Sequence, residues 1–168
     1  MKLAEAKKQF ISSWGAFGTQ WGINRTMAQI HALLLVSVHP ITQDEMMEEL
    51  SISRGNVNMN IRELIGWGLV DRVVIAGERK EFFTAEKDIW KVATKIIKER
   101  KKRELDPMIK LLSQLEYIEG DKKDKEVQQF TQVLGSIKKL GLKADKTLNV
   151  MIKAEEKWFT GSILKMLK

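Results

Sequence analysis

The chain has 168 residues, with 29 Lys and Arg against 22 Asp and Glu, and it contains no Cys. Its hydrophobic fraction of 43% and charged fraction of 30% are those of a soluble globular protein. The lack of Cys excludes disulfides, Cys-based zinc sites and thiol nucleophiles, and it agrees with a reducing compartment, so we expect the cytoplasm. The net charge of +7 favours a polyanionic partner, nucleic acid before an acidic membrane surface. The longest apolar run, residues 32–36, falls far short of the ~20 residues that span a bilayer.

The first predicted helix covers residues 1–22 and carries a bulky apolar stripe. Leu3, Phe10 and Phe17 recur every seven residues, and Trp14 falls in the complementary half of the same repeat. Three glycines weaken the second half of this helix. A stripe this aromatic typically packs on a distant segment or on a second subunit, so we expect the helix to join a dimer interface.

Two short capped helices follow a core helix over residues 25–37. Thr42 and Glu45 form a capping box that opens the first of them. After a three-residue turn, Ser53 can cap the second, which is predicted over residues 54–67. Two short helices joined by so tight a turn are typical of a helix-turn-helix.

A β-hairpin is predicted next. Residues 69–76 are rich in β-branched side chains, residues 77–79 make the turn and residues 80–84 return. Helix, turn, helix and hairpin in this order form a winged helix, to which we assign residues 23–86. The predicted fold class is therefore mainly α with a small β-hairpin, a winged helix-turn-helix domain followed by a helical dimerisation arm.

The arm, residues 87–168, is predicted as four helices. We expect the breaks between them at Asp106-Pro107, at Gly120-Asp121 and from Gly141 to Asp145. This region is expected to dimerise and to hold any effector site.

The second helix of the helix-turn-helix combines a buried apolar face with a polar face. At about 100° per residue, its aliphatic side chains share the face toward the core. Asn is a weak helix former, but it can pair bidentately with adenine in the major groove, as Arg can with guanine. The alternative is that these Asn are only solvated. The expected base-facing set is Asn56, Asn58, Met59, Asn60 and Arg62.

The helix N-terminus and the wing over residues 70–84 are the expected backbone contacts. A helix N-terminus attracts phosphate and glycine permits close approach, while a wing tip can reach the adjacent minor groove. The alternative for the wing cations is that they only prevent edge aggregation. The contacts expected outside the base-facing set are Thr42, Ser53, Arg54, Gly55, Arg72, Arg79 and Lys80.

These motifs resemble the GbsR-like branch of the MarR class of bacterial transcriptional regulators. The resemblance covers about the first 105 residues and rests on residues 21–26, 30–34, 40–45, 53–58 and 77–83. It implies a dimeric winged-helix repressor or activator whose wing carries a D-R…R pattern, here Asp71-Arg72 and Arg79. It also implies dimerisation through helices outside the winged domain, and some GbsR-like members respond to choline.

The five Trp residues suggest an effector site. Trp14, Trp21 and Trp90 could hold a quaternary ammonium compound by cation–π attraction, although aromatic packing in the core and the dimer is the alternative. The basic run from Lys98 to Arg103 could touch DNA or an acidic lipid surface, or it is the solvated face of a helix.

Neither an enzyme nor a bound cofactor or metal is expected. The chain has two His, no Cys and no H-E-x-x-H, G-x-S-x-G or phosphate-binding Gly-rich motif. The sequence predicts a homodimeric regulator that binds a palindromic DNA duplex. The alternative is a winged-helix adaptor that binds a protein and reads no DNA, but an adaptor has no need of an Asn-rich face.

Overall fold

The structure is a computed structural model that describes residues 1–118 and 123–166, with side chains described as far as residue 154. It divides into two compact units, unit 1 (Met1–Val92) and unit 2 (Ala93–Lys168). Within the described ranges, no helix has the length and hydropathy needed to cross a bilayer.

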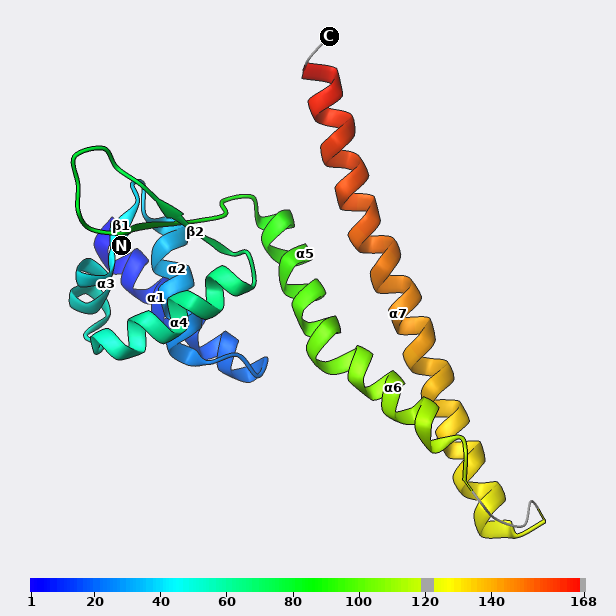
Figure 1. The fold of residues 1–168 in the computed structure, drawn as a ribbon. Coiled ribbons are helices and arrows are strands. Elements are labelled where there is room, and N and C mark those ends of the chain that lie inside the picture. The colour runs from blue at the N-terminus through cyan, green and yellow to red at the C-terminus, as the bar shows by residue number, and fades with distance from the viewer. Residues whose placement is uncertain (119–122, 167–168) are drawn as a thin grey trace. The chain divides into compact units, whose positions relative to one another are not determined.

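Unit 1 has the order of a winged helix, which confirms the predicted fold class (Figure 1). Its strands form an antiparallel sheet of order β1-β3-β2, in which β3 pairs with both neighbours. The elements are α1 (Leu3–Gln20), α2 (Arg25–Val36), β1 (Ile41–Thr42), α3 (Gln43–Leu50), α4 (Arg54–Gly66), β2 (Val70–Val73) and β3 (Phe82–Ala85).

The core of unit 1 is arranged around α2, which contacts α1, α3, α4 and β3. Seven of its twelve residues are buried, so α2 is apolar nearly all round as predicted. Each fully buried large apolar side chain contributes about 1.5–3 kcal/mol relative to exposure. The largest of these core side chains are Phe83, Ile30, Leu34, Met46, Ile61, Leu64, Leu69 and Val57.

The predicted caps of the two short helices are confirmed. Thr42 Oγ1 accepts from the Glu45 amide at 3.3 Å, and the Glu45 carboxylate accepts from the Thr42 amide at 2.6 Å. Ser53 Oγ accepts from the Asn56 amide at 3.3 Å and caps α4. The turn between them closes at Ser51, whose φ of 52° is left-handed.

The strands are shorter than predicted. The pairing of β2 with β3 runs from Val70 opposite Ala85 to Val73 opposite Phe82. Val74 is β-branched but 94% exposed, so nothing packs on it to extend the strand. The wing is therefore a loop over residues 74–81, and the two-residue strand β1 was not predicted at all.

Two glycines of α1 are packing positions and not points of weakness, which corrects the prediction. A Cβ on Gly15 would lie 2.6 Å from Cγ of Gln29, and one on Gly18 would lie 2.6 Å from Cβ of Ala28. Both glycines are buried, because α1 and α2 approach closely there. The aromatic stripe of α1 faces elsewhere, with Phe17 53% exposed.

This packing predicts that Gly18→Ala destabilises the protein by about 1–3 kcal/mol, since the Ala28 contact forces α1 away from α2. The matched control is Gly66→Ala in α4, where a Cβ meets nothing within 4 Å. The control should stabilise by about 0.5–1 kcal/mol through helix propensity. Urea unfolding measures both changes, and equal free energies of unfolding for the two variants would contradict the close approach.

Two basic side chains lie within or against α2. Lys87 Nζ donates to the carbonyl oxygens of Leu35 at 2.9 Å and Ser37 at 2.8 Å, and also to that of Leu34. Lys87, in the segment after β3, thereby caps the C-terminal end of α2.

His31 is buried in α2. Burial, with a smaller contribution from the Lys87 charge, lowers the pKa of His31 to about 4.

The lowered His31 pKa predicts a loss of stability in acid. Between its ordinary pKa of 6.5 and about 4, the unfolded chain binds a proton at His31 and the folded chain does not. The free energy of unfolding should therefore fall as pH decreases through this window, by about 3 kcal/mol in total. His31→Leu should remove this part of the decrease, and His39→Gln, at an exposed position, should leave it intact. Urea unfolding at pH 7 and pH 4.5 decides, and an unchanged decrease in His31→Leu would refute the assignment.

Unit 2 is helical. The predicted start of α6 at Asp106 is confirmed, but a π-helical segment joins it to α5 without a break. The predicted break at Gly120-Asp121 lies outside the described residues. The elements are α5 (Ile89–Arg100), which begins in unit 1, η1 (Lys101–Leu105), α6 (Asp106–Leu115) and α7 (Lys125–Met166).

The predicted break from Gly141 to Asp145 is wrong, because α7 continues through it. Gly141 is buried against α6, where an added Cβ would lie 3.3 Å from Cγ1 of Ile109. Asp145 accepts from Lys101 at 2.8 Å. This glycine allows close helix packing and does not end the helix.

Helices α6 and α7 run antiparallel (Figure 1) and pack on each other. Apolar residues at heptad spacing on each helix lie roughly a quarter turn from the contact between the helices. Because the helices are antiparallel, the two rows point to the same side. We name this surface the arm face; its side chains are 36–68% exposed and are Met108, Leu111, Leu115, Phe130, Val133, Ile137 and Leu140.

The opposite side of the same helix pair is rich in lysine. It forms a shallow hollow of about 530 Å³ in which Lys138 pairs with Glu116 at 2.6 Å. The other residues that line it are Gly135, Lys139, Leu142, Lys143 and Lys146. The helix pair is therefore amphipathic, with one apolar face and one basic face.

Candidate nucleic-acid interface

Helix α4 buries the predicted face, with Val57, Ile61 and Leu64 each at most 1% exposed. On the other side of the helix, Met59 is 58% exposed and Arg62 and Gly55 are exposed. Asn56 and Asn58 are half-buried at its edges. The packing of α4 on α2 thus fixes which side chains a partner can meet.

The structure removes Asn60 from the predicted base-facing set. Asn60 is 1% exposed, and its Nδ2 donates to the backbone oxygen of Asn56 at 2.8 Å. The helical phase explains the error, because Asn60 lies next to Leu64 at the border of the buried face. Its amide is satisfied inside the helix, as buried polar groups generally are.

Thr42 is likewise not a surface contact. It is 6% exposed, and its hydroxyl donates to the Glu45 carboxylate at 2.8 Å. These hydrogen bonds lower the pKa of Glu45 and hold the first turn of α3. Thr42 therefore acts as a helix cap.

The wing carries the remaining predicted cations. Arg72 of β2 pairs with Glu81 at 2.8 Å across the hairpin, and both side chains are more than half exposed. Arg79 and Lys80 lie in the exposed loop. The structure thus places three cations on the exposed surface of the hairpin and its loop.

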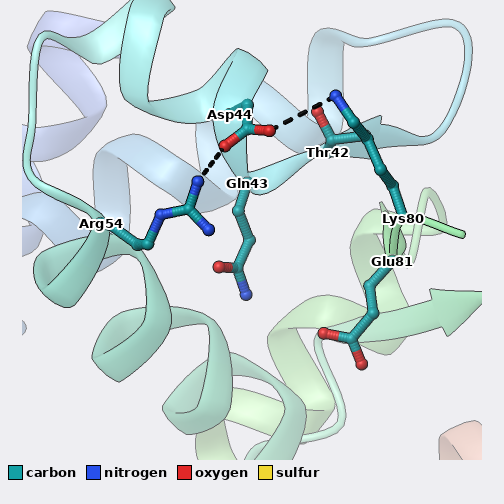
Figure 2. A pocket seen from close by; sticks show the side chains of 6 residues that line it. All are labelled: Thr42, Gln43, Asp44, Arg54, Lys80 and Glu81. Atoms are coloured by element: carbon teal, nitrogen blue, oxygen red, sulfur yellow. Dashed lines mark hydrogen bonds and ion pairs between the residues drawn. The ribbon is translucent and has the colours of Figure 1, made fainter.

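An acidic residue that was not among the predicted contacts joins the helices to the wing. Asp44 of α3 accepts from Nη2 of Arg54 at 2.6 Å and from Nζ of Lys80 at 3.4 Å (Figure 2). These side chains, with Thr42, Gln43 and Glu81, line a hollow of about 160 Å³. Asp44 is visible in the sequence only as an acid in a first helical turn, because its partners come from elements that the fold brings together.

The structure also describes the predicted basic run. Arg100 and Arg103 of the basic run pair with Glu104 and Glu99 along their own helix, which favours the solvated-face interpretation.

Trp21 and Trp90, two residues of the predicted effector site, are 63% and 77% exposed. In the part of the chain that the structure describes, the one close ring pair is Phe10 with Trp14, at a centroid distance of 5.4 Å. The three predicted Trp residues thus form no cage within one chain, and the quaternary ammonium site stays a prediction.

Comparison with known proteins shows a family to which part of the chain is similar. The family model described as MarR family matches residues 21–81, which include α2, the helix-turn-helix and most of the wing. Over these residues the chain is similar to the MarR family, and the relative described below supports a GbsR-like regulator. This family comprises transcriptional regulators and not enzymes.

One curated relative is the HTH-type transcriptional repressor GbsR of Bacillus subtilis (strain 168), 27% identical over 103 residues, which are 61% of this chain. The match spans 57% of the length of that relative. A solved structure titled as a transcriptional regulator has a TM-score of 0.68 at 18% identity, over 90% of this chain and 99% of its own. This likeness shows that the fold is shared. A mutant of S. aureus MepR bound to oligodeoxyribonucleotide reaches a TM-score of 0.41 at 15% identity, over 80% of this chain and 92% of its own.

Proposed function

We propose that this chain is a homodimeric transcriptional regulator that binds duplex DNA, with α4 in the major groove and the wing on the adjacent minor groove or backbone. The observation that carries the proposal is the solvent-facing side of α4. This side presents the exposed Met59 and Arg62 and the half-buried Asn58, while the other side of the helix is buried. Similarity to the MarR family over residues 21–81 and to a protein named a repressor supports it. The net charge of +7 suits a polyanion.

The residues divide by chemistry into two groups. The amides of Asn56 and Asn58 and the guanidinium of Arg62 can hydrogen-bond to base edges, and Met59 offers an apolar contact to a thymine methyl. The start of α4 and the wing supply backbone contacts that carry no sequence information. These backbone contacts are Ser53, Arg54, Gly55, Arg72, Arg79 and Lys80.

The arm face supports the homodimer. Seven partly exposed apolar side chains at heptad spacing on two adjacent helices exceed the scattered apolar residues of a monomer surface. An identical face on a second copy is a self-complementary partner for them, as twofold symmetry requires. The stripe of α1 is a second candidate contact. A twofold dimer presents two copies of α4, so the preferred site is a palindrome with half-sites about one helical turn or a multiple apart.

Binding assays test the assignment of DNA contacts. Selection from random duplexes should enrich a palindrome. On it, Asn58→Ala or Arg62→Ala should lose about 1–3 kcal/mol of binding free energy and relax preference at one base pair. Arg79→Ala should instead weaken binding to all duplexes alike and reduce the salt slope by about one.

The matched control is Lys139→Ala, which removes one charge from the basic side of the arm. It should reproduce the parent affinity. No enrichment of any sequence, together with parent-like binding by Asn58→Ala and Arg62→Ala, would favour the protein-binding adaptor.

Charge placed on the arm face tests the dimer. Ile137→Glu should break it, because two buried carboxylates would have to leave water without a partner. The control Leu142→Glu adds the same charge on the basic side and should leave the dimer intact. Light scattering should give twice 19.3 kDa for the parent and control. A monomeric parent, or a dimeric Ile137→Glu variant, would contradict the proposed interface.

A further inference from the structure

The Asp44 carboxylate lies between two cations that we assign to the DNA backbone. Its Oδ1 is 2.6 Å from Nη2 of Arg54, at the start of α4, and its Oδ2 is 3.4 Å from Nζ of Lys80, in the wing (Figure 2). One acid thus connects α3, α4 and the wing at the proposed DNA surface.

An acid at this position opposes the binding of a polyanion. A carboxylate repels an approaching phosphate. The same carboxylate also pairs with both cations that would otherwise attract the phosphate. The fold does not depend on these ion pairs, because Arg54, Asp44 and Lys80 are 66%, 48% and 63% exposed, and pairs so exposed to water contribute little to stability. The cap of α3 is already supplied by Thr42 and Glu45. Such weak pairs can exchange partners readily.

We propose that Asp44 is a positioning residue that restrains Arg54 and Lys80 in the free protein and competes with DNA phosphate for them. The inference rests on the proposed DNA binding and adds a regulatory element to it. When the cations turn to phosphate, the released carboxylate takes up a cation from solution. That uptake offsets part of the counterion release that drives binding, so Asp44 lowers both the affinity for any duplex and the salt dependence of that affinity.

The test is Asp44→Asn, which keeps the shape of the side chain and removes the charge. Affinity for a random-sequence duplex at low salt should rise about threefold to tenfold. The plot of log affinity against log salt should become steeper by about one. The ratio of specific to non-specific affinity should not change, because the base-facing residues are unaltered.

Glu49→Gln is the matched control, since it removes the same charge from the same helix, where Glu49 forms no ion pair among the described residues. It should change affinity less and leave the salt slope at the parent value. The double variant Asp44→Asn with Lys80→Ala should return the slope of Asp44→Asn toward that of the parent, because one released cation is then gone. Circular dichroism checks the fold, and Asp44→Ser replaces Asp44→Asn if the latter does not fold.

The outcomes separate the two proposals. If the parent binds duplexes and Asp44→Asn binds no tighter than Glu49→Gln, the restraint is wrong and the DNA-binding proposal stands. If neither the parent nor any variant binds a duplex, the proposed function fails and the restraint fails with it. If only Asp44→Asn binds, both proposals are supported.

Discussion

The burial of α2 is the constraint on which the rest of unit 1 depends. Helices α1, α3 and α4 and strand β3 all contact it, so their orientations follow from how their side chains cover one apolar helix. The close approach of α1 requires Gly15 and Gly18, since a Cβ at either would come within 2.6 Å of an α2 side chain. Lys87 caps the end of the same helix from the other end of the winged domain. One packed helix thereby fixes the relative positions of α4 and the wing.

The surface that results is electrostatically mixed and not simply basic. Arg54, Arg72 and Lys80 are each held by a carboxylate of Asp44 or Glu81, at distances of 2.6 to 3.4 Å. Because these side chains are largely exposed, the pairs are weak and can open toward a stronger anion. In the proposed function, DNA phosphate competes with these carboxylates for the cations, so the acids contribute to the affinity along with the basic residues.

Local signals in the sequence were sufficient to predict the winged helix. The capping residues Thr42 and Ser53 determine where two helices begin, and the period of Val57, Ile61 and Leu64 identifies the buried side of α4. Contacts between distant segments were not predictable in this way. In the sequence, Gly15 and Gly141 are indistinguishable from helix breakers. Only the fold shows that Gln29 packs against Gly15 and Ile109 against Gly141. Asn60 lies at the border of the buried face, so its exposure depends on how deeply α4 packs. Asp44 gains its partners only when α4 and the wing fold beside α3.

Hydrogen exchange on the full chain, with and without a selected duplex, tests the central claim most directly. The account predicts added protection in the start of α4 and in the wing loop, residues 53–62 and 74–81, with none in the basic side of α7. Protection confined to α7, or to the arm face alone, would show that the winged domain does not carry the DNA contact and would contradict the account.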